Sequence, residues 1–208
     1  MVTNKVILIT GAASGIGYGL FKDLQSRNKV YCLDKIDREN IHFLCDVSNA
    51  KDVENLMKSL KGIDVLINAA GIMPFEESEQ VMSTNFFGIV NMMRFCPMQK
   101  GGVIINIASI SGIQADTDVP IYAASKAAVI SYTKAMAKKL APDVRVNCVS
   151  PGFFRTNLVE GETPQELISQ VPMQREAYID ELYELIPCII NSTYMTGSNV
   201  VIDGGMVL

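Results

Sequence analysis

KVILITGAASGIG, residues 5–17, is the stretch of sequence that decides the fold of this chain. It opens with an apolar run typical of a buried strand, and a helical pattern begins near Ile16. Between them Gly11, Gly15 and Gly17 allow a tight turn, the close approach of a diphosphate, and close packing of helix on strand. Free N–H groups at the start of the helix attract the anion. The stretch therefore predicts a dinucleotide-binding turn, although glycines alone also occur in ordinary strand-to-helix turns.

An acidic residue, Asp34, ends the second predicted strand, about 20 residues beyond the glycine turn. A carboxylate there accepts hydrogen bonds from the ribose hydroxyls of adenosine and repels a 2′-phosphate. The turn itself carries no basic residue, since Ser14 precedes Gly15. The pattern favours NAD. Lys35 leaves NADP open, because a cation beside Asp34 could pair with the 2′-phosphate unless it is only a solvated charge.

Short apolar runs alternate with helical patterns along the whole chain, which is typical of a parallel sheet covered on both faces. The predicted strands are 5–10, 29–33, 41–45, 65–68, 103–108, 145–149 and 199–202, and the predicted helices are 16–26, 50–60, 79–95, 121–140 and 175–190. Residues 34–40 are too few for a crossover helix. We therefore expect an α/β fold with a doubly wound, Rossmann-type parallel sheet of about seven strands and a shortened or missing helix between strands 2 and 3.

Length and composition predict one domain over residues 1–208, with 49% hydrophobic residues available for its core. The net charge of −4 argues against nucleic acid as a partner. No apolar run is long enough to span a membrane or to form a signal peptide. The five cysteines are scattered and predict free thiols in a reducing, cytoplasmic compartment. His42 is the only histidine, so we expect no metal site.

A tyrosine and a lysine, Tyr122 and Lys126, lie four residues apart in a helical pattern and so share one helix face. A tyrosine hydroxyl titrates near pH ~10, and a nearby ammonium lowers that pKa toward neutrality. Ser109 stands upstream, at the carboxyl end of the predicted strand 103–108. A tyrosine and a lysine at this spacing are common by chance. With the serine and the glycine turn they predict an acid–base site beside a bound nucleotide.

On these residues the chain resembles the short-chain dehydrogenase/reductase family over nearly its whole length. The matching segments are Thr10–Gly17, Asn68–Gly71, Asn85, Ser109, Tyr122 with Lys126, Pro151-Gly152 with Thr156, and Asp203-Gly204-Gly205. The resemblance implies a hydride transfer between a nicotinamide cofactor and a carbonyl or secondary alcohol.

The resemblance also implies four catalytic roles. Tyr122 exchanges a proton with the substrate oxygen, and Lys126 lowers the pKa of Tyr122 and binds the nicotinamide ribose. Ser109 holds the substrate oxygen, with Ser111 as a competitor for that role. Asn85 holds a water that links Lys126 to solvent.

The cofactor residues implied by the resemblance come from the glycine turn, the ends of four strands and the helix at Tyr122. They are Gly11, Ser14, Gly15, Ile16, Gly17, Asp34, Asp46, Val47, Asn68, Ala69, Ala70, Gly71, Tyr122, Lys126, Pro151, Gly152, Phe154 and Thr156. Asp46 and Val47 would contact the adenine. Alternatively, the Asp46–Ser48 stretch provides the N-cap of the next helix.

The leading function is an NAD(P)-dependent oxidoreductase of carbonyl compounds or alcohols, with a 3-oxoacyl-thioester reductase as one candidate. The alternatives are a dinucleotide-sensing protein without chemistry, which would lack the tyrosine or the lysine, and an epimerase or dehydratase, whose relatives are usually longer. The resemblance implies a small-molecule substrate bound under a loop at 153–174. It also implies a homotetramer or dimer formed through helices 85–95 and 121–140.

Overall fold

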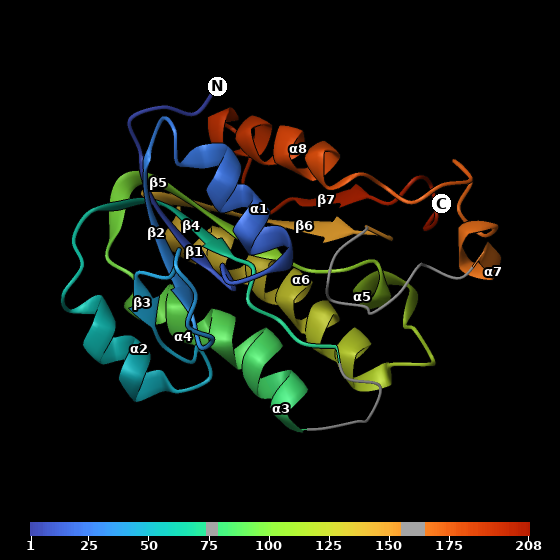
Figure 1. Ribbon diagram of the computed structural model, residues 1–208, viewed down its shortest axis with the longest axis horizontal. Helices are drawn as coiled ribbons and strands as arrows, with labels where there is room; N and C mark the ends of the chain where they lie inside the picture. The colour runs from blue at the N-terminus through green and yellow to red at the C-terminus, as the bar shows by residue number, and fades with distance from the viewer. Residues whose placement is uncertain (74–78, 155–164) are drawn as a thin grey trace.

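A computed structural model describes residues 1–73, 79–154 and 165–208 (Figure 1). Within these residues seven parallel strands form one sheet in the order β3-β2-β1-β4-β5-β6-β7. The strands are β1 Val6–Thr10, β2 Lys29–Asp34, β3 Phe43–Leu44, β4 Ile63–Asn68, β5 Met98–Ile107, β6 Val144–Pro151 and β7 Asn199–Ile202. The predicted doubly wound parallel sheet is confirmed.

Helices cover both faces of this sheet (Figure 1). Helices α1 and α8 pack on one face, whereas α2, α4 and α6 pack on the other. The helices are α1 Gly15–Leu24, α2 Ala50–Met57, α3 Glu79–Met82, the π-helix η1 Ser83–Phe87, α4 Gly88–Phe95, α5 Ser111–Gln114, α6 Pro120–Leu140, α7 Gln165–Ile168 and α8 Ile179–Asn191. The predicted helix over 79–95 is thus present, with a π-helical turn inside it.

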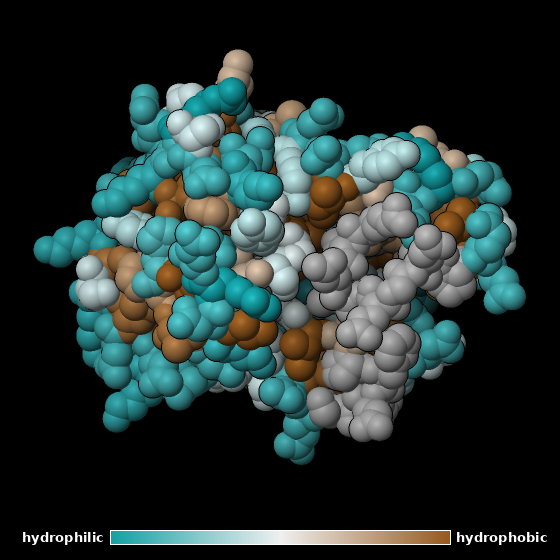
Figure 2. Space-filling view, in the orientation of Figure 1, coloured by the Kyte–Doolittle hydropathy of each residue, from teal (hydrophilic) through white to brown (hydrophobic). Residues whose placement is uncertain are grey.

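The core follows from the alternation of side chains along the strands. In β1, Ile7 and Ile9 face the α1 and α8 layer, and Leu8 faces the α2, α4 and α6 layer. All three are fully buried, as expected of a parallel strand with both faces covered. On the side seen in Figure 2, hydrophilic residues cover most of the described surface and hydrophobic ones appear in scattered patches.

The chain between β2 and β3 contains no helix in residues 35–42, all of which the structure describes, so the predicted missing crossover helix is confirmed. β3 is also shorter than the predicted strand over 41–45. The backbone N–H of His42 donates to Cys32 O at 3.0 Å, and the ring Nδ1 of His42 accepts the backbone N–H of Cys32 at 3.2 Å. The side chain of His42 therefore takes the place of a backbone acceptor next to β2. The single histidine therefore has a structural role here.

The last helix begins four residues later than the prediction of 175–190. Arg175 makes a two-pronged ion pair with Glu181, with both N–O distances at 2.8 Å. Glu181 also accepts the N–H of Tyr178 at 2.8 Å, which holds residues 175–178 outside the helix. Hydrophobic periodicity does not reveal this side-chain contact.

We predict that Gly19→Ala destabilises the fold through the contact of α1 with α8. A Cβ at Gly19 would overlap the hydroxyl group of Tyr183, and such overpacking costs about 1–3 kcal/mol. In a Tyr183→Ala background the same change should instead stabilise by about 1 kcal/mol, because alanine is the better helix former. Urea unfolding of the wild type, the two single variants and the double variant measures these changes in the free energy of unfolding. An equal effect of Gly19→Ala in both backgrounds would contradict the packing contact.

Candidate active site

A crevice is expected where β1 and β4 lie side by side, because the helices that follow them leave toward opposite faces of the sheet. The ends of the two strands are joined by Thr10, whose Oγ1 accepts the N–H groups of Ala69 and Ala70, both at 3.2 Å. Gly11 has a φ of +69°, and a Cβ there would lie 2.6 Å from the Ala70 nitrogen. Only glycine fits both this backbone conformation and this close approach.

The start of α1 lies directly on the glycine turn. A Cβ at Gly17 would overlap Gly11 O, so the helix packs directly on the turn. Ser14, the residue before the helix, is exposed and extended and makes no side-chain cap. The first N–H groups of α1 therefore have no side-chain cap and suit a diphosphate.

Asp34 lies beside this turn, as predicted from its position at the end of β2. Its Oδ2 accepts the N–H of Ala13 at 2.9 Å and its Oδ1 accepts that of Ile36 at 3.0 Å. Asn40 adds a hydrogen bond from Nδ2 to Ala12 O at 2.8 Å. These hydrogen bonds therefore hold the glycine turn next to Asp34, the carboxylate that would bind adenosine.

The Asp46 side chain does not cap the next helix. Asn49 is the N-cap of α2, and its side chain accepts the N–H groups of Lys51 and Asp52. Asp46 Oδ1 instead accepts from the N–H and hydroxyl of Ser48, at 2.9 and 2.7 Å. Burial pushes the pKa of Asp46 up, but the Ser48 hydrogen bonds and the nearby Lys35 charge leave it below the ordinary value.

The side chain of Asn68, one of the predicted cofactor residues, is buried in the sheet. Its Nδ2 donates to Asn106 Oδ1 at 2.8 Å, and Asn106 Nδ2 donates to Thr133 Oγ1 at 2.9 Å. This chain of hydrogen bonds joins β4 and β5 to α6. The Asn68 Oδ1 atom has no partner among the described residues.

Helix α6 carries Tyr122 and Lys126 on one face, with side chains that are 8% and 5% exposed. The Lys126 Nζ lies 5.5 Å from the centre of the Tyr122 ring. Ser109 follows β5, and its side chain is hydrogen-bonded to that of Tyr122. The Ser111 N–H donates to Ser109 Oγ at 3.1 Å and holds the hydroxyl in place. The three side chains predicted from the sequence thus come together at the carboxyl end of β5.

The protonation of this group differs from the sequence-based expectation. Burial raises the pKa of Tyr122, the hydrogen bond with Ser109 opposes that effect, and the charge of Asp116 adds to it. The net shift of the Tyr122 pKa is therefore upward, opposite to the lowering expected from the neighbouring ammonium. Burial of both side chains explains this, because it disfavours phenolate and ammonium alike.

Lys126 is held by the strand that leads to Ser109. Its Nζ donates to Ile107 O at 2.9 Å, and burial lowers its pKa to about 8. Gly71 lies alongside, since a Cβ there would be 3.5 Å from this Nζ. The lysine therefore stands next to the turn that follows β4.

Two residues of this group were missed by the sequence analysis. Asn85, which was predicted, lies in η1 and donates from Nδ2 to Ser125 Oγ at 3.2 Å. Ser125 was missed, although it lies one helical turn after Tyr122, a spacing that could have identified it. Asp116 was also missed, and it accepts the Ser111 hydroxyl at 3.2 Å. Nothing in the local sequence indicates that Asp116 folds back toward Ser111.

The segment after β6 is fixed at its base. The Gly152 N–H donates to Ile202 O at 2.9 Å, and a Cβ at Gly152 would lie 2.8 Å from Asp203 Cα. Phe154 forms a bridge with Ala177. Residues 155–164 of the predicted substrate loop, Thr156 among them, lie outside the described residues.

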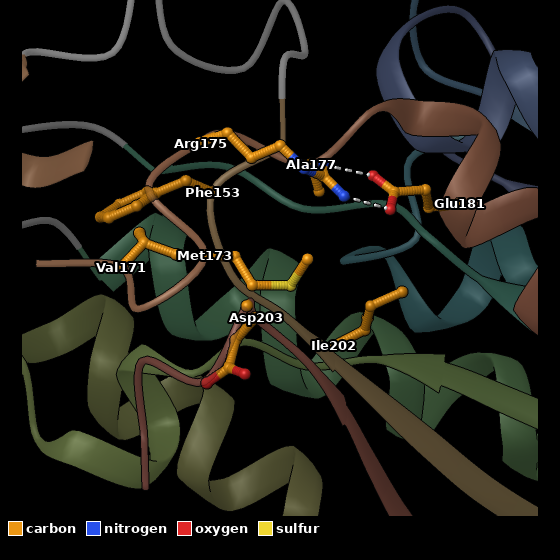
Figure 3. Close-up of a pocket in the computed structure, with 9 residues that line it drawn as sticks. Phe153, Val171, Met173, Arg175, Ala177, Glu181, Ile202 and Asp203 are labelled. Atoms are coloured by element: carbon orange, nitrogen blue, oxygen red, sulfur yellow. Dashed lines mark hydrogen bonds and ion pairs between the residues drawn. The ribbon is translucent and has the colours of Figure 1, made fainter. Parts of the chain in front are cut away.

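A small cavity of about 70 Å³ lies beyond this base, beside the Arg175–Glu181 ion pair (Figure 3). Its lining includes Phe153, Val171 and Met173 of the predicted substrate loop, and none of the residues predicted to bind cofactor. It is well below the ~300 Å³ of a typical small-ligand pocket. We therefore do not assign it to the substrate.

The described residues contain no group of three or more His, Cys, Asp or Glu side chains placed to hold a metal ion. Within the same residues no helix has both the length and the apolar character needed to cross a membrane.

Comparison with known proteins agrees with this geometry. Residues 5–167 match the short chain dehydrogenase family. The chain is 33% identical to the 3-oxoacyl-(acyl-carrier-protein) reductase FabG of Thermotoga maritima, covering 99% of this chain and 98% of that protein. It is 30% identical to carbonyl reductase family member 4 of Xenopus tropicalis, with 99% of each chain covered.

A solved structure gives the same result in three dimensions. The 3-ketoacyl-(acyl-carrier-protein) reductase of Brucella melitensis, complexed with NADH, has a TM-score of 0.87 and 27% identity, with 100% of each chain covered. The alignment with the Thermotoga protein runs over 242 residues, whereas this chain has 208. That relative therefore carries insertions relative to the present chain.

We predict that Asp116→Asn lowers the pKa of Tyr122. The carboxylate disfavours a second negative charge on the phenol, so its replacement by an amide lets Tyr122 lose its proton at lower pH. The ultraviolet absorbance of tyrosinate during a pH titration, corrected with Tyr122→Phe, measures this.

Asp118→Asn is the matched control, because Asp118 is exposed and contacts Asp116 only through its backbone N–H. An unchanged Tyr122 titration in Asp116→Asn, or an equal shift in the control, would contradict the effect of Asp116.

Proposed function

Because this chain belongs to the short chain dehydrogenase family, we propose that Ser109, Tyr122 and Lys126 carry out the chemistry of an NAD(P)-dependent oxidoreductase. The observation that carries the proposal is the meeting of these three side chains beside the β1–β4 crevice. The family membership and the named reductases among the relatives make the chain an oxidoreductase. The roles of the individual residues are our proposal.

The residues of the crevice fit a dinucleotide. The Gly11 and Gly17 positions exclude any side chain, the start of α1 lacks a side-chain cap, and Asp34 stands beside the turn. We infer that the diphosphate lies at the start of α1 and the adenosine between Asp34 and Asp46. The backbone of residues 68–71 and 151–154, together with Thr156, would line the nicotinamide half.

When bound, the nicotinamide supplies or takes up the hydride. The protein provides the proton and the geometry. Tyr122 gives its proton to the substrate oxygen in reduction and takes it back in oxidation, a contribution typically worth about 10²–10⁴ in rate. Ser109 holds the same oxygen through its hydroxyl, which is already fixed by the N–H of Ser111. Lys126 would leave Ile107 O and bind the ribose hydroxyls beside Gly71.

The raised pKa of Tyr122 favours the acid form, which suits the reductive direction. A 3-oxoacyl thioester is our first candidate substrate, because relatives in Thermotoga and Brucella are named as reductases of this class. Other carbonyl compounds and secondary alcohols are the second class to test.

We propose NAD as the preferred cofactor. Asp34 would meet a 2′-phosphate with a negative charge, and Ser14 offers no compensating cation in the turn. The Lys35 charge acts on Asp46, which supports its being a structural surface charge. The Brucella relative was solved with NADH.

We further propose a single domain that assembles into a homotetramer in the cytoplasm. The seven strands of the described residues share one sheet, which supports a single domain. Phe87 is 51% exposed and touches the ring of Phe86, which packs against Tyr132 of α6, and this aromatic surface on η1 and α6 suits a subunit contact. All five cysteines are free, and four are buried, which fits a reducing compartment.

We predict that Tyr122→Phe lowers turnover by about 10²–10⁴ and leaves NADH affinity nearly unchanged. The change removes only the hydroxyl that moves the proton. NADH oxidation with a panel of carbonyl compounds that includes a 3-oxoacyl thioester measures turnover, and nucleotide fluorescence measures binding. Undiminished turnover in this variant would remove the proposed mechanism.

We predict tighter binding of NADH than of NADPH, and a smaller difference in Asp34→Asn. The amide removes the repulsion of the 2′-phosphate but still offers an oxygen to the turn. Fluorescence titration of both nucleotides measures the ratio. Asp37→Asn is the control, since Asp37 is an exposed acid in the same connection. A wild-type preference for NADPH would overturn the role given to Asp34.

A further inference from the structure

The side chain of Asn85 has its two donor positions and one acceptor position occupied within the protein. Its Oδ1 accepts the Ile72 N–H at 2.8 Å, and its Nδ2 donates to Ile72 O at 2.9 Å and to Ser125 Oγ at 3.2 Å. Both Nδ2 hydrogens are therefore in use, and the residue is fully buried. Asn85 acts as a clamp between the turn after β4 and helix α6, with no N–H left for a substrate or a water.

Ser125 is the residue of α6 that receives this clamp. Its hydroxyl donates to Tyr122 O at 2.7 Å and accepts from Asn85 Nδ2. The side chain is 0% exposed, so water cannot replace either partner. A serine in a helix often donates to a carbonyl in the preceding turn. Here that bond turns the oxygen lone pair toward Asn85.

The clamped turn passes close to the catalytic lysine. Gly71 directly precedes Ile72, and a Cβ at Gly71 would lie 3.4 Å from Asn85 Oδ1 and 3.5 Å from Lys126 Nζ. Any loosening of Ile72 therefore changes the surroundings of Lys126. The π-helical turn η1 places Asn85 in this buried position while Phe87, two residues on, stays exposed. Such π-helical turns are frequent at functional sites.

We propose that Ser125 is a positioning residue, which acts through Asn85 to hold the Gly71–Ile72 turn against the helix that carries Tyr122 and Lys126. This inference rests on the proposed function for its effect on turnover. The contact itself is independent of that function. Ser125 affects the reaction only through Asn85 and the Gly71–Ile72 turn, and it does not touch the substrate.

Ser125→Ala removes the hydroxyl and leaves Asn85 with an unpaired buried N–H. We expect kcat to fall about tenfold, the loss that corresponds to about 1.4 kcal/mol for one such hydrogen bond, and the pH profile of kcat to shift because Lys126 is disturbed. NADH affinity should change little. Ser131→Ala is the matched control, because Ser131 is exposed on the same helix.

Ser125→Cys separates positioning from packing. A thiol fills the space of the hydroxyl but is a weak hydrogen-bonding group. It should lose activity as the alanine variant does. Recovery of wild-type kcat in Ser125→Cys would overturn the proposal, because it would show that only volume matters.

A double-mutant cycle tests whether Ser125 acts through Asn85. The kcat of the double variant Asn85→Ala/Ser125→Ala should equal that of Asn85→Ala within about twofold. The reason is that both substitutions break the same hydrogen bond. Losses that multiply would contradict a shared clamp.

A readout without turnover keeps this test separate from the proposed function. The Ile72 N–H is protected by Asn85, so its hydrogen exchange, followed by NMR, should speed up about tenfold in Ser125→Ala, while exchange in β1 stays as in the wild type. Unchanged exchange at Ile72 would overturn the clamp. If no variant and no wild-type protein turned over a carbonyl compound, the proposed function would fail while the clamp could still stand.

Discussion

The contact between the turn after β1 and the turn after β4 is the constraint on which the rest of the site depends. Gly11 lies so close to Ala70 that no Cβ fits between the two backbones, and Thr10 holds the second turn by two hydrogen bonds. The two turns thus meet backbone to backbone, at the place proposed for the diphosphate and the ribose. Asp34 on one side and Lys126 on the other are positioned relative to this contact.

Burial is the largest influence on the pKa values of Tyr122 and Lys126, the proposed acid–base group. It raises the pKa of Tyr122 and lowers that of Lys126 to about 8, so burial disfavours the charged form of each side chain relative to water. The sequence predicted a phenol acidified by its neighbouring ammonium, but the net shift of the Tyr122 pKa is upward because the side chain is buried. A tyrosine that keeps its proton is ready to act as an acid, whereas its use as a base requires a further charge in the site.

Hydrogen bonds of buried polar residues tie the catalytic helix to the sheet at two levels. Asn106 and Thr133 join β5 to the middle of α6, and Asn85 and Ser125 join the turn after β4 to its first half. An unpaired donor at either level would be costly, because water cannot reach it. The helix is therefore fixed in rotation as well as in distance, which an acid–base pair on one of its faces requires.

The sequence by itself determined the parallel sheet, the glycine turn, the missing crossover helix and the order of Ser109, Tyr122 and Lys126. These follow from local patterns: buried strands are apolar, tight turns need glycine, and residues four apart share a helix face. Only the tertiary structure decided the start of α8, the use of Asn85 as a clamp, the partnership of Ser125 and the effect of Asp116 on Tyr122. Each depends on which side chains meet in the folded protein and on how far water is excluded there. A local sequence pattern predicts neither of these.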